Sequence, residues 1–280
     1  MFYILRRHGL GNGSTKAIQQ YSQHPITILR SDNLPVLNNK DTVLRWGCTT
    51  SIPCHVDDTP KVLNNTKSIH YSNNKKEFRL ILQIKHPEIT PKTWLVSEDE
   101  KITFPCIIRP QNHAQGKHLY LCSSYTELLN TCNKFTFLDT GYISKYIPKV
   151  AEYRVCFIQG LVAWVAQKTP KDPQDIAWNV AQGSRFNNLR WKQWPISVIE
   201  AAYKAYILSG LYLGGVDVMV DKDGRSFVLE INSAPSHTSP YRQQCTTKCI
   251  DYGITNNNFK HLQPNEEFKK YGKWLHPALK

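Results

Sequence analysis

Three oxygen-bearing side chains, Asp217, Glu230 and Asn232, lie in one short segment, residues 215–235. This segment reads as two apolar runs joined by an Asp-Lys-Asp-Gly turn, which is typical of a β-hairpin. Strand alternation places Glu230 and Asn232 on one face, and pairing around the turn brings Asp217 near them. Two carboxylates and an amide oxygen suit Mg²⁺, so we expect a metal site for the phosphates of a nucleotide.

The alternative for this segment is an ordinary hairpin whose acids face solvent. Its apolar residues favour burial instead, and a buried carboxylate cluster without a cation would be costly. These residues are Val216, Val218, Val220, Val228, Leu229 and Ile231.

Composition describes a folded protein with a large core. The chain has 280 residues, of which 41% are hydrophobic and 11% aromatic, so two lobes are expected. No apolar run approaches the roughly 18 residues that span a bilayer. Residues 1–8 do not pair a charged leader with an apolar segment, so we expect a cytoplasmic protein without membrane contact.

The formal net charge of +13 favours an anionic partner, such as a nucleotide, an acidic peptide or a nucleic acid. Lysines and arginines are spread along the chain instead of forming a compact basic run. Nucleic acid is therefore the least expected of these partners.

The first 74 residues predict a small α/β domain. Residues 2–5, 26–29 and 42–45 read as strands, and a helix over 16–22 follows a glycine-rich turn, with Ser14 or Thr15 as its cap. The turn lacks the spacing of a nucleotide-binding fingerprint. Residues 63–71 are polar and rich in Asn, which suits a linker.

The following residues carry groups that could bind ATP. A helix is expected over 75–85, with Lys76 at its start, and a buried strand over 104–110 carries Arg109 near its end. A polar loop that contains Gly116 follows this strand. Phosphates need cationic donors on one side and a metal on the other, which Lys76, Arg109 and the hairpin acids would supply.

The order of these segments resembles the ATP-grasp superfamily over residues 75–236. The resemblance is closest to the carboxylate–amine ligases of the ribosomal-protein glutamate ligase type. The segments that carry it are Lys76 with Ile89-Thr-Pro91, residues 104–110 with Gly116, Ser144–Ile147 with Glu152–Val155, Asn179–Gly183, and Asp217 with Glu230-Ile-Asn232 and Pro235.

The resemblance implies an α/β (α+β) ATP-grasp fold, in which two α+β lobes grip ATP behind the small domain. The ATP-grasp domain would span residues 75–253, with a lid lobe over about 75–142 and a metal-binding core lobe over about 143–253. Residues 254–280 would form a polar tail.

The resemblance also assigns roles to single residues. Lys76 and Arg109 would hold phosphates under a lid loop, residues 111–117, and Tyr146 and Ile147 would offer backbone groups to adenine. Arg154 would orient the substrate carboxylate or stabilise an acyl phosphate. The remaining assignments are Asn179 to phosphate or metal; Asp217, Glu230 and Asn232 to two magnesium ions, which Mn²⁺ could replace; and Gln182 and Gly183 to substrate.

Several positions depart from the family pattern. Arg109 replaces a more usual lysine, and Lys145 stands where an acid often meets the ribose, leaving Glu152 as an alternative acid. Ala177 replaces a basic residue. His113 and Lys117 either touch phosphates themselves or face solvent. Arg242 is either an anchor for a substrate carboxylate or part of a structural salt bridge.

The function expected from the resemblance is ATP-dependent ligation of a carboxylate to an amine through an acyl phosphate, releasing ADP and phosphate. The amine would belong to an amino acid, peptide or protein, and the enzyme would be a monomer or a homodimer. Two alternatives are a phosphotransferase on the same scaffold and a basic nucleic-acid- or virion-associated protein without catalysis. The intact hairpin acids argue against the second.

Overall fold

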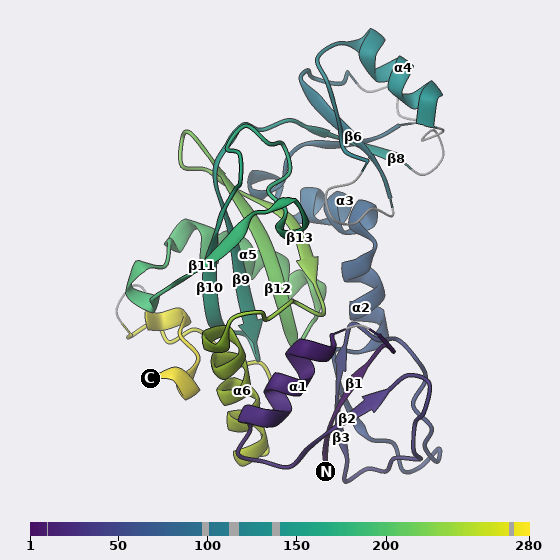
Figure 1. Ribbon diagram of the computed structural model, residues 1–280, viewed down its shortest axis with the longest axis vertical. Coiled ribbons are helices and arrows are strands. Elements are labelled where there is room, and N and C mark those ends of the chain that lie inside the picture. Colours follow the sequence, from purple (N-terminus) through teal and green to yellow (C-terminus); the bar gives the residue numbers. More distant parts are fainter. Residues whose placement is uncertain (10, 97–100, 112–117, 136–140, 269–271) are drawn as a thin grey trace.

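In the computed structural model, the described residues form three β-sheets, which follow one another along the long axis of the molecule (Figure 1). The structure describes residues 1–280 except 10, 97–100, 112–117, 136–140 and 269–271. A parallel sheet lies at the end that carries the N-terminus, an antiparallel lid sheet lies at the other end, and a five-stranded antiparallel sheet lies between them.

The N-terminal unit is a four-stranded parallel sheet in the order β2-β1-β3-β4, with α1 beside it. Asn64, which is buried, joins this unit to the central sheet. Its amide nitrogen donates to the Arg45 and Leu213 carbonyls, and its oxygen accepts from the Tyr212 N–H. The elements are β1 (Phe2–Arg6), α1 (Asn12–Tyr21), β2 (Ile26–Arg30), β3 (Thr42–Trp46) and β4 (Lys61–Leu63).

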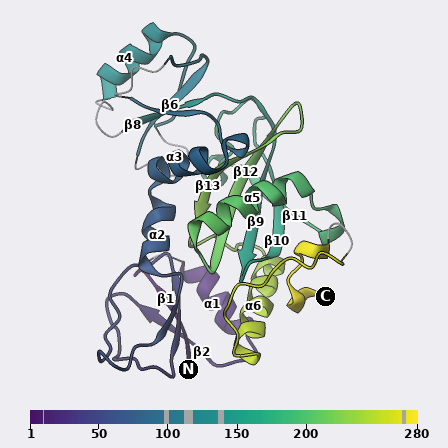
Figure 2. The same cartoon turned by 180° about the vertical axis from the view of Figure 1, so that it is seen from behind.

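Two consecutive helices lead from this unit to the lid sheet (Figure 2). The lid sheet has the order β5-β8-β6-β7 and is antiparallel throughout. The elements are α2 (Thr66–Asn73), α3 (Lys75–Lys85), the 3₁₀ turn η1 (Pro87–Ile89), β5 (Thr93–Leu95), β6 (Cys106–Pro110), β7 (Tyr120–Cys122), α4 (Tyr125–Phe135) and β8 (Gly141–Lys145).

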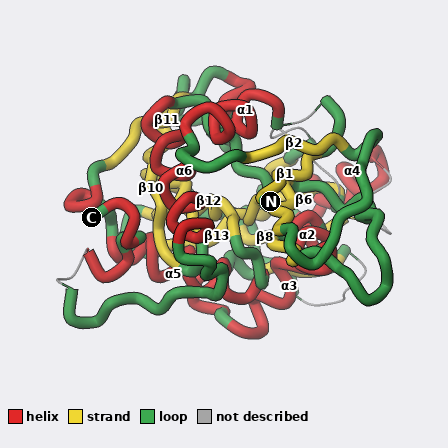
Figure 3. The backbone as a smooth tube through the Cα atoms, turned by 90° about the horizontal axis from the view of Figure 1, so that it is seen from below, coloured by secondary structure: helices red, strands yellow, loops and turns green. Residues whose placement is uncertain are grey.

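The central sheet has the order β11-β10-β9-β12-β13. Figure 3 shows α5 on one face of this sheet, and α6 with α1 on the other. The elements are β9 (Lys149–Ile158), β10 (Leu161–Thr169), η2 (Val180–Gln182), β11 (Arg185–Leu189), η3 (Trp191–Gln193), α5 (Ile196–Ser209), β12 (Leu213–Asp221), β13 (Ser226–Asn232) and α6 (Pro240–Thr255), followed by η4 (Gly272–Trp274) and η5 (Pro277–Leu279).

The last residues of the chain pack into the core beneath this sheet, although the sequence suggests a polar tail. Trp274 and Leu275 are buried in the cluster that contains α5 and the central strands. Leu275 forms a parallel bridge with Val162, and the His276 N–H donates to the Val162 carbonyl.

Three expectations from the sequence need correction. The first helix begins at Asn12, so Ser14 and Thr15 lie inside its first turns and are buried, and Gly11 precedes it with φ 69°. The expected linker over 63–71 holds most of α2, which Asn65 caps by accepting from the Ser68 N–H. A further helix, α6, follows the hairpin, where the sequence predicts none.

In the described part of the chain, no helix combines the length and apolar character needed to cross a membrane.

Candidate functional site

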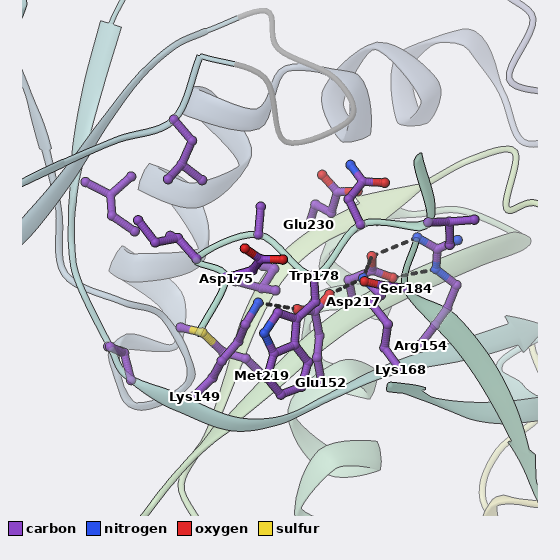
Figure 4. A pocket seen from close by; sticks show the side chains of 18 of the residues that line it. Lys149, Glu152, Arg154, Lys168, Asp175, Trp178, Ser184, Asp217, Met219 and Glu230 are labelled. Atoms are coloured by element: carbon purple, nitrogen blue, oxygen red, sulfur yellow. Dashed lines mark hydrogen bonds and ion pairs between the residues drawn. The ribbon is translucent and has the colours of Figure 1, made fainter. Parts of the chain in front are cut away.

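A cleft of about 750 Å³ lies between the lid sheet, α3 and the central sheet. Its size falls within the range of small-molecule sites. Figure 4 shows side chains of β9, β10, β12 and β13 converging at its floor.

Tyr146 and Ile147, which the resemblance assigns to adenine, line this cleft in the connection between β8 and β9. Apolar side chains line it as well, including those of Ile107, Met219 and Leu229. The Tyr146 N–H donates to the Pro105 carbonyl at 3.1 Å. A backbone hydrogen bond from Tyr146 to a base would therefore have to use its carbonyl oxygen.

The hairpin places Asp217 directly opposite Glu230, through a register shift between Asp217 and Val218; the sequence predicts only that Asp217 lies near Glu230 and Asn232. Each carboxylate has a cationic partner of its own. The Arg154 Nε and Nη2 donate to the two Asp217 oxygens at 2.5 and 2.7 Å, and the Lys75 Nζ lies 2.6 Å from the Glu230 Oε2. The Asn232 amide donates to the Glu230 Oε1 at 3.1 Å.

The partners of Glu230 keep it ionised. Burial by itself raises the pKa of this carboxyl, but Lys75, Asn232 and Arg154 outweigh burial and lower the pKa to about 2. Glu230 is therefore an anion at neutral pH, as a metal ligand must be.

The hairpin set fits a hard divalent cation. Among the described residues, no group of three or more His, Cys, Asp or Glu side chains is placed to hold a metal. An ion at Asp217, Glu230 and Asn232 would thus have two carboxylates and one amide oxygen, with further oxygens supplied by phosphate or water, which is usual for Mg²⁺.

A third carboxylate, Glu152, is buried in the cleft between two lysines. The Lys149 Nζ lies 2.6 Å from its Oε2, and Lys168 pairs with its Oε1 (Figure 4). The Lys168 Nζ also lies 3.7 Å from the Asp217 Oδ2. Lys168 therefore connects Glu152 with the Arg154–Asp217 pair.

Sequence reasoning did not identify Lys149 and Lys168. The sequence signal at Lys168 was weak: it follows the apolar run at residues 161–166 by two residues, and the register of β10 with β9 then sets it directly opposite Glu152. Glu152 and Arg154 are two residues apart on β9, so both side chains lie on the same face of the sheet.

Two arginines lie close to the Tyr142 ring at the lid side of the cleft. The guanidinium carbons of Arg109 and Arg79 lie 5.2 and 6.0 Å from the centre of the Tyr142 ring. The Arg79 Nη2 donates to the Leu229 carbonyl, whereas its buried Nε and Nη1 have no hydrogen-bond partner among the described residues. Burial and then the Arg109 charge lower the pKa of Arg79 to about 10, so it remains a cation.

The structure places Lys75, and not Lys76, at the cleft. Lys75 and Arg79 are four residues apart on α3 and therefore share one face of the helix, about a third of a turn away from Lys76. The sequence pattern identified the correct helix but not the face that meets the cleft.

Of the other predicted residues, Asn179 and Arg242 line the cleft, whereas Gln182 and Gly183 do not. Gln182 lines a shallower hollow beside it. Gly183 has φ 97° and ends η2, which Asn179 caps by accepting from the Ala181 N–H. His113, Gly116 and Lys117 lie outside the described residues.

Comparisons with known proteins identify the family of this chain. The family described as RimK-like ATP-grasp domain matches residues 79–251, more than half of the chain. A search of curated proteins finds no match.

Solved structures share the fold at low sequence identity. The ATP complex of D-alanine–D-alanine ligase from Bacillus anthracis superposes with a TM-score of 0.59 and 15% identity, covering 91% of this chain and 94% of that one. L-amino acid ligase from Bacillus licheniformis gives 0.53 and 13%, with 89% and 74% covered.

The macrocyclase MdnC from Microcystis aeruginosa MRC, bound with the precursor peptide MdnA, gives a TM-score of 0.59 and 11% identity, with 88% and 98% covered. Together, the family match and the shared fold confirm the expectation from the sequence. The chain belongs to the RimK-like ATP-grasp family.

Proposed function

We propose that the protein joins a carboxylate to an amine through an acyl phosphate. A carboxylate oxygen of the substrate attacks the γ-phosphorus of ATP, and the bond to the bridging oxygen breaks to release ADP. The amine nitrogen then attacks the acyl carbon, phosphate leaves with the electrons of the C–O bond, and the nitrogen loses its proton. The products are an amide, ADP and phosphate.

One observation carries the proposal: the side chains of Lys75, Arg79 and Arg109 line the same cleft as a pair of opposed carboxylates. Lys75, Arg79 and Arg109 would hold the phosphates, and Arg79 contributes two buried nitrogens that no described residue satisfies. Cations fixed at the position where negative charge develops favour the transition state over the substrate.

The hairpin residues Asp217, Glu230 and Asn232 would hold the magnesium ions. Bound there, magnesium would offset charge on the transferring phosphoryl group. Tyr146 and Ile147 would border the adenine, and Asn179 a phosphate.

Arg154 would act beside the acyl group. Its Nε and Nη2 hold Asp217, and its Nη1 is not used in that pair. A guanidinium locked by a buried carboxylate can present its remaining nitrogen to a substrate oxygen without losing further side-chain entropy.

The test is ADP release from ATP and Mg²⁺ in the presence of pooled amino acids and peptides. Wild type should turn over only when a suitable acid and amine are both present, and Glu230→Ala should lose at least 100-fold in kcat/KM. Glu266→Ala removes an exposed carboxylate outside the cleft and serves as the control. Hydroxylamine in place of the amine should trap the acyl phosphate as a hydroxamate.

A stable phosphorylated product that forms without any amine would overturn the proposal in favour of a phosphotransferase. Turnover that is unchanged in Glu230→Ala would show that the hairpin carboxylate is not part of the active site.

A further inference from the structure

Arg242 occupies an unusual position at the edge of the cleft. Only 3% of the residue is exposed, and its guanidinium carbon lies 5.4 Å from the Trp164 ring centre and 5.2 Å from that of Phe186. Its Nη2 donates to the Thr238 hydroxyl at 3.0 Å. Its Nε and Nη1 are buried and find no hydrogen-bond partner among the described residues, and no described carboxylate forms an ion pair with it.

This position is electrostatically unfavourable for a cation. Arg242 lies in the first turn of α6, where the aligned peptide dipoles already supply positive charge, and no acidic residue stands in that turn. Burial, and then the charge of Arg154, lower the pKa of Arg242. A structural salt bridge, one of the two readings of this residue from sequence, therefore has no acidic partner in the described part of the chain. An anion bound here would remove all of these costs.

The neighbouring cations are already neutralised. The ring of Phe186 is approached by Arg154 at 5.0 Å and Lys168 at 5.3 Å as well as by Arg242. Arg154 is paired with Asp217, and Lys168 with Glu152. Arg242 differs from the other two cations, because no carboxylate among the described residues forms an ion pair with it.

Arg242 lies at the end of the cleft away from the adenine side. The connection with Tyr146 and Ile147 precedes β9, whose first residue is Lys149, whereas Arg242 lies near Arg154 and packs on Trp164, which is opposite Cys156. At about 3.3 Å per strand residue, Lys149 and Arg154 are roughly 16 Å apart. Arg242 is thus placed beyond the Asp217 carboxylate, where substrate and not nucleotide would lie.

The whole cleft has surplus positive charge. Nine lysine or arginine and four aspartate or glutamate side chains of the described chain line it. ATP complexed with two magnesium ions is roughly neutral, so it would leave much of this surplus uncompensated. The surplus favours a further anion in the cleft.

Resting on the proposed ligase function, we propose that Arg242 forms a subsite for a second substrate carboxylate, one that does not react. The ligase would then act on a substrate that carries an anionic carboxylate besides its reacting group. This carboxylate belongs either to the acid that is activated, which is then a dicarboxylate, or to an amino-acid acceptor. Arg242, flanked by two aromatic rings and braced by Thr238, is positioned before substrate arrives, and an arginine so placed suits carboxylate recognition.

The first test compares substrates with a free carboxylate and the same substrates with that carboxylate amidated. Wild type and Arg242→Met are assayed for ADP release with both sets, amidating first the acid and then the amine. Arg242→Met should raise KM for the free-carboxylate substrate roughly 10- to 100-fold, the equivalent of losing charged hydrogen bonds, and leave KM for ATP unchanged. With the amidated substrate, Arg242→Met and wild type should have the same KM. If amidating the acid removes the difference between the two proteins, the acid carries the bound carboxylate; if amidating the amine removes it, the amine does.

Arg242→Lys keeps the charge but loses the guanidinium, so its KM should lie between those of wild type and Arg242→Met. Arg30→Met removes an exposed arginine of the N-terminal unit and should match wild type throughout. Equal KM increases for free and amidated substrates in Arg242→Met would overturn the proposal.

A binding measurement tests the carboxylate subsite without requiring ligase turnover. Protein saturated with magnesium and a non-hydrolysable ATP analogue is titrated with glutarate and with glutaramide, and its melting temperature is followed. Glutarate should stabilise wild type but not Arg242→Met, and glutaramide should stabilise neither. Nucleotide binding without turnover in any pool would count against the ligase function alone, whereas an equal response of both proteins to glutarate would overturn the carboxylate subsite.

Discussion

Arg154 and Asp217 lie directly opposite each other on β9 and β12 and share two hydrogen bonds of 2.5 and 2.7 Å. Both side chains are largely buried, at 14% and 5% exposure. The residue proposed to contact the acyl group thus also fixes one of the proposed metal ligands. The pair would join the proposed acyl site to the proposed metal site.

We predict that Arg154→Met destabilises the protein by about 3–5 kcal/mol, because Asp217 is left as a buried charge without its hydrogen-bonded partner, and the Lys168 Nζ is 3.7 Å away. Urea unfolding measures the change. The double variant Arg154→Met/Asp217→Leu should recover much of the loss, since it removes both charges. Equal stability of the single and double variants would mean that the pair does not neutralise Asp217.

The neighbouring lysines of α3 distinguish the structure from the sequence prediction. Lys75→Ala should raise KM for ATP about tenfold or more, because it removes a cation next to the phosphates and the partner of Glu230. Lys76→Ala should change KM less than twofold, since Lys76 does not line the cleft. A larger effect at Lys76 would restore the assignment from the resemblance. Steady-state kinetics with ATP varied decides between them.

The hairpin and its acids were predictable because their signals are local. The turn, the alternation and the oxygen-bearing side chains all lie within 215–235, so the sequence could place Asp217 near Glu230 and Asn232. Their exact register could not be read, because an irregularity between Asp217 and Val218 shifts the pairing by one residue and sets Asp217 opposite Glu230. The start of α3 at Lys75 was equally readable, since Asn74 caps it by accepting from the Glu77 N–H.

The missed features depend on contacts between distant segments. Helix α6 packs against α1 and the central sheet, and the face that it buries includes polar residues such as Thr246 and Asp251. Its sequence therefore shows no apolar stripe from which the helix could be predicted. Lysine in a strand usually indicates exposure, and only the register of β9 with β10 shows that Lys168 faces Glu152. Domain limits, oligomeric state and a cytoplasmic location remain predictions from the sequence.

Acid stability should report the Glu230 ion pair. The pKa of Glu230 is about 2 in the folded protein, below the ordinary value of 4.5, since Lys75, Asn232 and Arg154 outweigh the effect of burial. Between pH 4.5 and 2 the unfolded chain therefore binds more protons at this site, and stability falls as the pH is lowered through this window. Above pH 4.5 the contribution is fully present.

Glu230→Gln should flatten the dependence of the unfolding free energy on pH between 4.5 and 2, as urea titrations at several pH values would measure. Lys75→Met should flatten it in part, because Asn232 and Arg154 still favour the carboxylate. An unchanged slope in Glu230→Gln would show that other groups produce the acid sensitivity.

The C-terminal residues 272–280 should be required for stability, although none of these described residues lines the cleft. Trp274 is 5% exposed, contacts the Tyr203 ring at a centroid distance of 4.8 Å and belongs to the same core cluster as Val162. Trp274→Ala should therefore cost about 3–5 kcal/mol, the usual range for truncating a large buried aromatic side chain.

Val150→Ala, at a residue 61% exposed, should stay within about 0.5 kcal/mol of wild type in the same urea unfolding experiment. Where Trp274→Ala remains folded, its KM for ATP should equal that of wild type, because Trp274 does not line the cleft. A cost below about 1 kcal/mol would mean that residues 272–280 lie on the central sheet without supporting it. The buried Trp274 ring and the hydrogen bond from the His276 N–H to Val162 argue for support, since both would expose core groups to water if the segment detached.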